Sequence, residues 1–98
     1  MEIRTHPKAN SDFFESYFYY EKESPGLGER FYEEVKNAYA YIEKFPLRSK
    51  ILKNNYRRYT LKKFPFQIVY TYNKAKARIS VVAIYHASKH PKKRFRKF

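Results

Sequence analysis

The sequence predicts a small α+β domain, because a helical periodicity in its first half gives way to a strand periodicity in its second half. The chain has 98 residues, which is enough for one modest hydrophobic core and too few for two. Aromatic residues make up 20% of it, so there is ample apolar material for that core despite the high charge. We expect the order β-α-α-β-β-β in a single domain over residues 1–98, with an antiparallel helical hairpin packed on a three- to four-stranded antiparallel sheet.

The N-terminal strand is expected around Ile3 and ends at His6-Pro7. A helix follows, because aromatic residues repeat at helical spacing in Phe13, Tyr17 and Tyr20. Asp12 with Glu15 has the spacing of a capping box, whereas Pro7 suits the first helical position, so the start is placed between them. The helix ends near Glu23, because Ser24-Pro25-Gly26 cannot continue it.

A second helix is predicted from about Leu27 to Phe45, where Pro46 stops it. Its apolar residues step by three and four and form one face: Leu27, Phe31, Val35, Ala38, Ile42 and Phe45. The short break after the first helix favours an antiparallel hairpin. We expect Phe31, Val35 and Ile42 to face the sheet and to meet Val81 or Val82.

The second half of the chain predicts three strands. Residues 46–55 have no period and are expected to form a loop. Apolar and polar residues then alternate over 56–61, 66–72 and 79–86, with a turn at 73–76, which indicates an antiparallel meander. The run 81–84 is apolar on both faces and suits an interior strand. Residues 87–98 read as a basic C-terminal arm.

Charge is distributed very unevenly along the chain, whose net charge is +13. Residues 1–43 contain all nine acidic residues and five basic ones, a net charge of −4. Residues 44–98 contain seventeen basic residues and no acid. A compact unit with so many uncompensated cations repels itself, so a polyanionic partner, either nucleic acid or an acidic protein, is favoured over a basic face kept only for solubility.

Several classes of protein are disfavoured by composition. Without Cys there is no disulfide framework and no Cys-ligated metal. Gly26 and Gly28 fit no phosphate-binding loop, and no carboxylate follows Glu43, so neither a cofactor nor a metal is expected. No long apolar run predicts a membrane span, and the N-terminus lacks the apolar core of a secretory signal, so a cytoplasmic location is expected.

Two stretches resemble the RelE/ParE superfamily of toxins from type II toxin–antitoxin modules. The first runs over residues 56–70 and contains an Arg-rich strand, Phe-Pro-aromatic, and an apolar pair ending in Tyr. The second runs over residues 82–91, where a buried strand closes with His86 and a basic residue follows three positions later. The resemblance implies a growth-inhibiting toxin that an acidic antitoxin holds inactive.

The superfamily resemblance implies two targets. ParE-type members poison DNA gyrase and are not nucleases, whereas RelE-type members cut messenger RNA on the ribosome without a metal. The second activity would use Arg58, Lys62, His86 and Lys89 as catalytic residues. However, Thr60 stands where a Lys is expected, and Gln67 and Lys89 stand where Arg is expected. We therefore rank gyrase-like target binding first, ribosome-dependent mRNA cleavage second, and a small basic nucleic-acid-binding protein without toxicity third.

Other side chains are candidates for contact with the target or with nucleic acid. The basic candidates are Arg57, Lys63, Lys92, Lys93, Arg94 and Arg96. Tyr56 and Tyr59 could stack on bases, whereas Tyr70 and Tyr72 are better interpreted as half-buried strand aromatics. His86 has a second interpretation, as a strand-end histidine that is hydrogen-bonded to the backbone.

Overall fold

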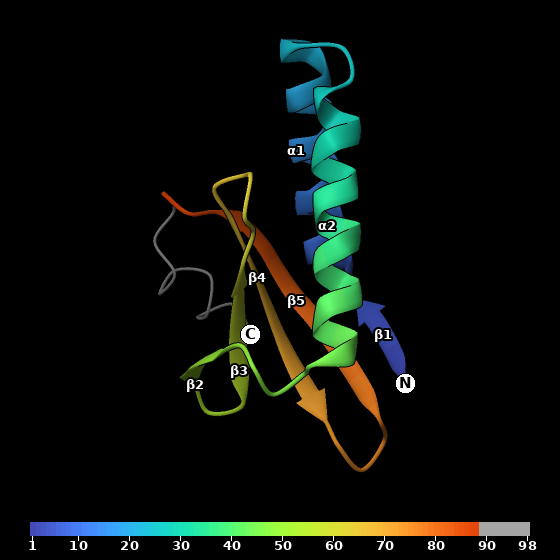
Figure 1. Cartoon of the computed structure of the whole chain (residues 1–98), viewed down its shortest axis with the longest axis vertical. Coiled ribbons are helices and arrows are strands. Elements are labelled where there is room, and N and C mark those ends of the chain that lie inside the picture. Colours follow the sequence, from blue (N-terminus) through green and yellow to red (C-terminus); the bar gives the residue numbers. More distant parts are fainter. Residues whose placement is uncertain (89–98) are drawn as a thin grey trace.

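The computed structural model describes residues 1–88 and contains two helices packed against one face of a five-stranded sheet (Figure 1). The elements follow in the order β1 (Glu2–Thr5), α1 (Pro7–Glu23), α2 (Leu27–Lys44), β2 (Lys50–Lys53), β3 (Tyr56–Thr60), β4 (Phe66–Asn73) and β5 (Arg78–His86). The α+β class and the helical hairpin are thus confirmed. Of the predicted basic arm, residues 87–98, only Ala87 and Ser88 belong to the residues that the structure describes.

The sheet has one strand more than the sequence predicts, and it is mixed. Its order is β1-β5-β4-β3-β2, with β1 parallel to β5 and the remaining pairs antiparallel. The additional strand is β2, so the prediction of a loop over 46–55 is wrong for Lys50–Lys53. Within residues 1–88 this strand pairs on one side only, and a register shift between Ile51 and Lys53 removes the alternation that would have revealed it.

Helix α1 begins at Pro7, earlier than the capping-box interpretation requires. His6 is the N-cap, and its Nδ1 atom accepts a hydrogen bond from the backbone N–H of Lys8 at 3.3 Å. The His6 ring thus takes the role of a Ser, Thr or Asp cap, and Pro7 has no N–H to satisfy at the first helical position. Asp12 and Glu15 therefore lie inside the helix, and the cap role predicted for them is wrong.

The turn of the hairpin is organised by one carboxylate. Glu21 Oε1 accepts hydrogen bonds from the backbone N–H groups of Gly26 and Gly28, both at 2.9 Å. Gly26 has φ of 90°, a conformation that glycine adopts without steric cost. A Cβ atom at Gly28 would lie 2.7 Å from the carbonyl oxygen of Tyr17, so the close approach of the helices depends on glycine there.

The main core lies between the hairpin and the sheet. Phe31, Val35 and Ile42 are buried in one cluster with Val81, which confirms the predicted face of α2. Val82 is instead the extra residue of a bulge, because Val69 pairs with Ala83 and Tyr70 with Val81. Val82 packs into a smaller cluster on the other side of the sheet, with Val69, Ala83 and Tyr85. No described helix is both long and apolar enough to cross a membrane.

Candidate functional site

The two faces of the sheet separate the candidate residues. Residues that pair across strands project from the same face, so the register assigns each side chain to a face. The helices cover the face that carries Ile68, Tyr70 and Val81. The opposite side, here called the outer face, carries a row of cross-strand partners in which Arg58 pairs with Val69 and Val69 with Ala83.

Thr60 and Gln67 are directly opposite each other on the outer face, where β3 pairs with β4. The Thr60 hydroxyl donates a hydrogen bond to the side-chain oxygen of Gln67 at 2.8 Å. At these two positions the nuclease pattern implies Lys and Arg. The two neutral side chains satisfy each other instead, so neither presents a cation to a phosphate.

Arg57 projects from the helix-covered face, since its cross-strand partner is the core residue Tyr70. Its Nη1 atom donates to the carbonyl oxygens of Leu47 at 3.1 Å and Ser49 at 2.9 Å. The Tyr70 hydroxyl donates to the carbonyl oxygen of Pro46 at 2.8 Å, and burial raises the pKa of this phenol. Arg57 is therefore engaged in holding the segment that leads into β2.

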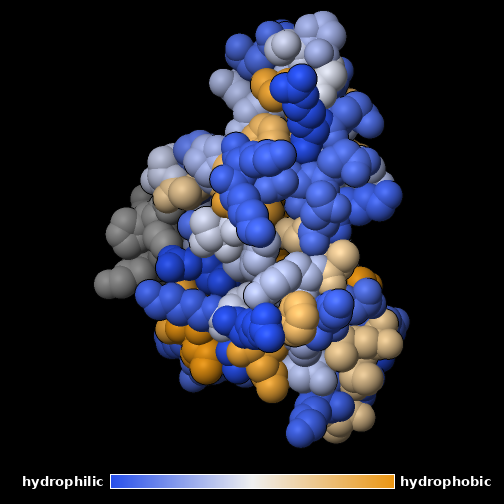
Figure 2. Space-filling view, in the orientation of Figure 1, coloured by the Kyte–Doolittle hydropathy of each residue, from blue (hydrophilic) through white to orange (hydrophobic). Residues whose placement is uncertain are grey.

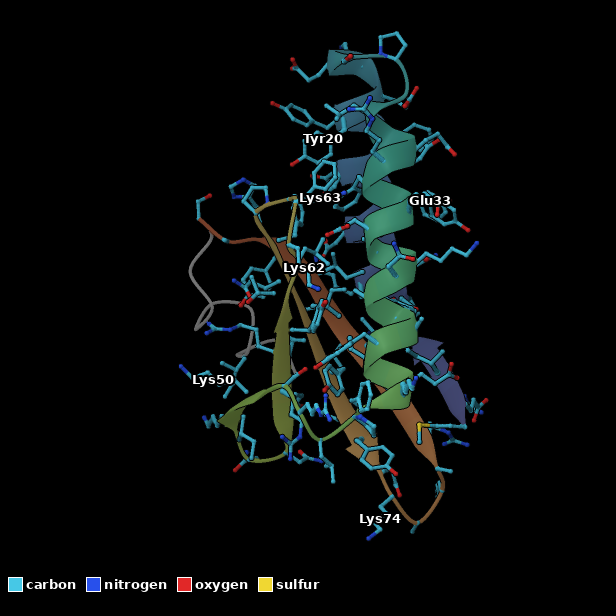
Figure 3. All side chains as sticks on the ribbon, viewed as in Figure 1. Tyr20, Glu33, Lys50, Lys62, Lys63 and Lys74 are labelled. Atoms are coloured by element: carbon cyan, nitrogen blue, oxygen red, sulfur yellow. The ribbon has the colours of Figure 1, made fainter. Side chains whose placement is uncertain are left out.

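Lys62 and Lys63 lie in the loop between β3 and β4, beside α2 (Figure 3). Their backbone N–H groups both donate to Glu34 Oε1, at 3.2 Å and 3.1 Å, while the residues themselves are exposed. Phe64 in the same loop packs on Phe31 with ring centroids 5.4 Å apart. The loop backbone is thus fixed to the hairpin, and the two ammonium groups remain available to a partner.

His86 projects from the helix-covered face at the end of β5, where it pairs with Phe66. Its Nδ1 atom lies 2.8 Å from Ser88 Oγ and accepts from the backbone N–H of Ser88 at 3.1 Å. This agrees with the interpretation of His86 as a strand-end histidine bonded to backbone. The ring also lines a cavity of about 550 Å³, together with Glu15, Ser16, Tyr19, Tyr20, Phe66 and Ser88.

The nuclease candidates are therefore not assembled at one point. Arg58 pairs with Val69 on the outer face, whereas His86 pairs with Phe66 on the helix-covered face. Three residues along β4 correspond to roughly 10 Å. Lys89 and the predicted contact residues Lys92, Lys93, Arg94 and Arg96 lie outside the described residues.

Sequence reasoning missed one member of the cavity beside His86. Glu15 was interpreted as a cap residue, but it lines this cavity with Ser16 and Tyr19. Its spacing of four from Tyr19 on one helix was the available signal. Within residues 1–88 no three His, Asp or Glu side chains are grouped so that they could hold a metal ion.

The strand tyrosines are largely engaged in packing. The ring of Tyr59 lies 5.3 Å from that of Tyr41, and burial raises the pKa of Tyr59. Tyr70 is buried and Tyr72 packs against the same core, in agreement with their prediction as strand aromatics. Tyr56 packs against the small cluster of the outer face. Stacking of bases on Tyr56 or Tyr59 remains a prediction.

The match to a family model gives the class of the chain, the toxins of type II toxin–antitoxin systems. Residues 3–91 match the family described as ParE toxin of the type II toxin–antitoxin system parDE. The chain belongs to this ParE toxin family. A comparison with curated protein sequences finds no significant match.

Solved structures share the fold at low sequence identity. The chromosomal ParDE system from P. aeruginosa has a chain that is 15% identical, with a TM-score of 0.76 over 90% of this chain and 97% of that one. The E. coli RelBE toxin–antitoxin complex gives 14% identity and a TM-score of 0.69, over 90% of this chain and 98% of that one. The RelBE2 toxin–antitoxin complex from Mycobacterium tuberculosis gives 15% identity and a TM-score of 0.60, over 87% of this chain and 95% of that one.

Proposed function

We propose that this ParE-family toxin inhibits growth by binding a nucleic-acid-processing target of the DNA gyrase kind, and that an acidic antitoxin neutralises it in the cytoplasm. The observation that carries the choice of target is the hydrogen-bonded pair of Thr60 and Gln67. RNA cleavage without a metal needs positioned cations to stabilise the charge that develops on the phosphate. Two of the positions expected to supply them hold neutral residues that bind each other.

The separation of Arg58 from His86 supports the same choice. General acid–base catalysis needs its groups within hydrogen-bond reach of the reacting atoms. Arg58 projects from the outer face and His86 from the face that the helices cover. A binding toxin has no such requirement, since it needs only complementary shape and charge. The third hypothesis, a basic protein without toxicity, is less supported because the chain belongs to a toxin family.

The charge of the molecule supports an acidic antitoxin. All residues after Glu43 are neutral or basic, so β2, β3 and β5 carry cations, β4 carries no charged residue, and none of these strands carries an acid. Such a surface attracts an acidic chain and raises its rate of association. The similar structures from P. aeruginosa and E. coli are described as toxin–antitoxin systems or complexes, which supports the kind of partner.

The test uses the purified protein in two parallel reactions, DNA supercoiling by gyrase and translation by ribosomes. We expect inhibition of supercoiling and intact messenger RNA. Replacement of Thr60 by Lys together with Gln67 by Arg supplies the cations of the nuclease pattern and is the matched variant. Codon-positioned cleavage of messenger RNA by the parent protein would overturn the proposal.

A second candidate function, ribosome-dependent mRNA cleavage, is favoured by one observation. His86 and Glu15 line the same cavity of about 550 Å³, so an acid and a base could act there together. In this case His86→Ala should reduce cleavage by roughly 10²–10⁴-fold. The same change should have little effect on a toxin that only binds gyrase.

A further inference from the structure

We propose that the free edge of β2 is the docking site for an extended acidic segment of the antitoxin, which adds to the sheet beside β2. The inference rests on the proposed function in one respect, that the partner is an antitoxin. It adds the surface that is used, the conformation of the bound segment and the pattern of its side chains.

The first support is the topology of the sheet. Strand β2 is the last in the order β1-β5-β4-β3-β2, so among residues 1–88 one side of its backbone has no neighbouring strand (Figure 1). Such an edge presents N–H and C=O groups that an extended peptide can pair with. Four residues, Lys50–Lys53, form this edge.

The second support is the charge of the edge. Lys50 and Lys53 are exposed, and Lys50 lies opposite Arg58 on the neighbouring strand. Figure 3 shows Lys50 at the border of the sheet, on the side away from the helices. The other edge strand, β1, carries Glu2, whose carboxylate contacts Arg4 at 2.9 Å and Arg78 at 3.0 Å. Strand β1 thus holds one acid and one cation, whereas β2 holds two cations and no acid, so an acidic segment is attracted more strongly to β2.

The same lysines select against the simplest competitor, a second copy of this chain. If two β2 strands paired antiparallel about their centre, Lys50 of one copy would lie opposite Lys53 of the other. Like charges that face each other across strands are destabilising. Edge lysines commonly prevent such self-pairing, and here they leave the edge open to a segment that carries acids.

The third support is exposed apolar surface on the same edge. Ile51 is 53% exposed, and Leu47, in the segment before β2, is 59% exposed. Figure 2 shows apolar surface where Figure 1 places β2, bordered by hydrophilic surface. Ile51 pairs with Arg57, which projects from the helix-covered face, whereas Lys50 shares the outer face with Arg58. A complementary strand therefore alternates acidic residues facing Lys50 with apolar residues facing Ile51.

The fourth support is that the edge is held in place before a partner arrives. Arg57 and Tyr70 donate to three carbonyl oxygens of the segment that precedes β2. After the strand, Asn54 adopts φ of 53°, which turns the chain back into β3. A fixed edge loses little conformational freedom on binding, so more of the contact energy appears as affinity.

The experiment compares two charge-reversal variants. The test variant is Lys50→Glu with Lys53→Glu, and the control is Lys74→Glu with Lys76→Glu in the exposed turn between β4 and β5. Both lower the net charge of +13 by the same amount, so long-range attraction falls equally. The probe is an acidic antitoxin co-expressed with the toxin. We expect the test variant to bind at least about tenfold more weakly than the control.

Hydrogen exchange on the unmodified complex gives a readout that needs no variant. Those amides of residues 50–53 that point away from β3 should exchange more slowly in the complex than in the free toxin, because an added strand accepts their hydrogen bonds. Equal loss of affinity in both variants, or unchanged exchange in β2 while the antitoxin is bound, would overturn the docking site. Protection of β2 in the free protein together with a dimeric mass would also overturn it, in favour of self-pairing. Absence of any antitoxin binding would instead count against the proposed function.

Discussion

Gly28 allows the two helices of the hairpin to approach closely. A Cβ atom there would lie 2.6 Å from Glu21 Cγ and 2.7 Å from the carbonyl oxygen of Tyr17. The second neighbour is backbone and cannot move without displacing α1. We predict that Gly28→Ala lowers the free energy of unfolding by about 1–3 kcal/mol, measured by denaturant titration.

Gly26 provides the matched control for this prediction. A Cβ at Gly26 would meet nothing within 4 Å, and its φ of 90° is the only source of strain. Asn is among the residues that visit the left-handed region, so Gly26→Asn should cost at most about 1 kcal/mol. If Gly28→Ala lowers the free energy of unfolding no more than Gly26→Asn does, the close contact between the helices at Gly28 does not constrain the side chain there.

The hydrogen bond from the Tyr17 hydroxyl to the Glu29 carboxylate makes stability depend on pH in the alkaline range. This bond and burial raise the pKa of Tyr17 from 10.0 to about 12. Because the folded-state pKa is the higher one, the contribution is complete below pH 10 and is lost as the pH rises through about 12. Burial raises the pKa of Tyr20, Tyr39, Tyr59 and Tyr70 in the same direction.

We therefore predict that Tyr17→Phe loses less stability than the parent between about pH 10 and about pH 12. Unfolding curves across this range, with tyrosinate absorbance recorded in parallel, measure the effect. Tyr19→Phe changes an exposed phenol on the same helix and is the control. Identical alkaline profiles for Tyr17→Phe and the parent would show that the contact with Glu29 does not contribute.

Among the elements, α2 was predicted correctly because its apolar residues repeat at one clear helical spacing, which identifies the buried face. Phe31, Val35 and Ile42 are buried as predicted. For the start of α1 the Pro7 alternative is confirmed and the capping-box alternative is wrong, because a histidine ring supplies the cap that the pattern assigned to Asp12. Strand β2 was missed because an edge strand buries little, so its sequence need not alternate.

The sequence was sufficient to identify candidate residues of the site, but not to predict how these residues are arranged on the two faces of the sheet. Arg58 and His86 were identified from the resemblance, yet the face from which each projects depends on strand register. The bulge at Val82 changes the alternation along β5, so Val81 and Ile84 project from one face although they are three residues apart. The bulge has no signal in the residue pattern of a single sequence, and the spacing of Glu15 from Tyr19 does not indicate that both line a cavity with His86.

The contribution of α2 to the core can be tested at Phe31. This side chain is fully buried, and its ring lies 5.5 Å from Phe13, 5.3 Å from Tyr20 and 4.9 Å from Phe66. Phe31→Ala should lower the free energy of unfolding by about 3–5 kcal/mol, because the cavity is lined by rigid aromatic rings. The neighbouring Tyr32 is 42% exposed, so Tyr32→Ala should cost much less. Thermal or denaturant unfolding that is equal for both variants would contradict the assigned face.

The loop between β3 and β4 depends on a single carboxylate from α2. Glu34 Oε1 accepts both backbone N–H groups of Lys62 and Lys63. We predict faster amide exchange at residues 62 and 63 in Glu34→Ala, with weaker inhibition of the target if these lysines contact it. Glu34→Gln keeps an acceptor oxygen and should restore part of the protection. Glu33→Ala, an exposed neighbour, should leave exchange in the loop unchanged.

In the whole molecule, the charge asymmetry of the sequence becomes an asymmetry between layers. The helical layer is built from residues 7–44, which include eight of the nine acids, whereas the charged residues of β2, β3 and β5 are all cations and β4 has none. The field of such a molecule is directional, so we expect an acidic partner to be drawn to the sheet rather than to the hairpin. The docking edge proposed at β2 lies within this basic layer, at the border farthest from β1 in the sheet.

Association with the antitoxin should therefore depend steeply on salt. Steering by charge raises rates of association by about 10–10³-fold, and the Debye length falls from about 30 Å at 0.01 M salt to about 3 Å at 1 M. We predict that the association rate of toxin and antitoxin, measured by stopped-flow fluorescence, falls at least about tenfold across this range. The dissociation rate should change far less, because contacts in the formed complex are short and partly shielded from ions. An association rate that is flat with added salt would mean that the net charge of +13 does not guide the encounter, and the basic layer would then need another explanation.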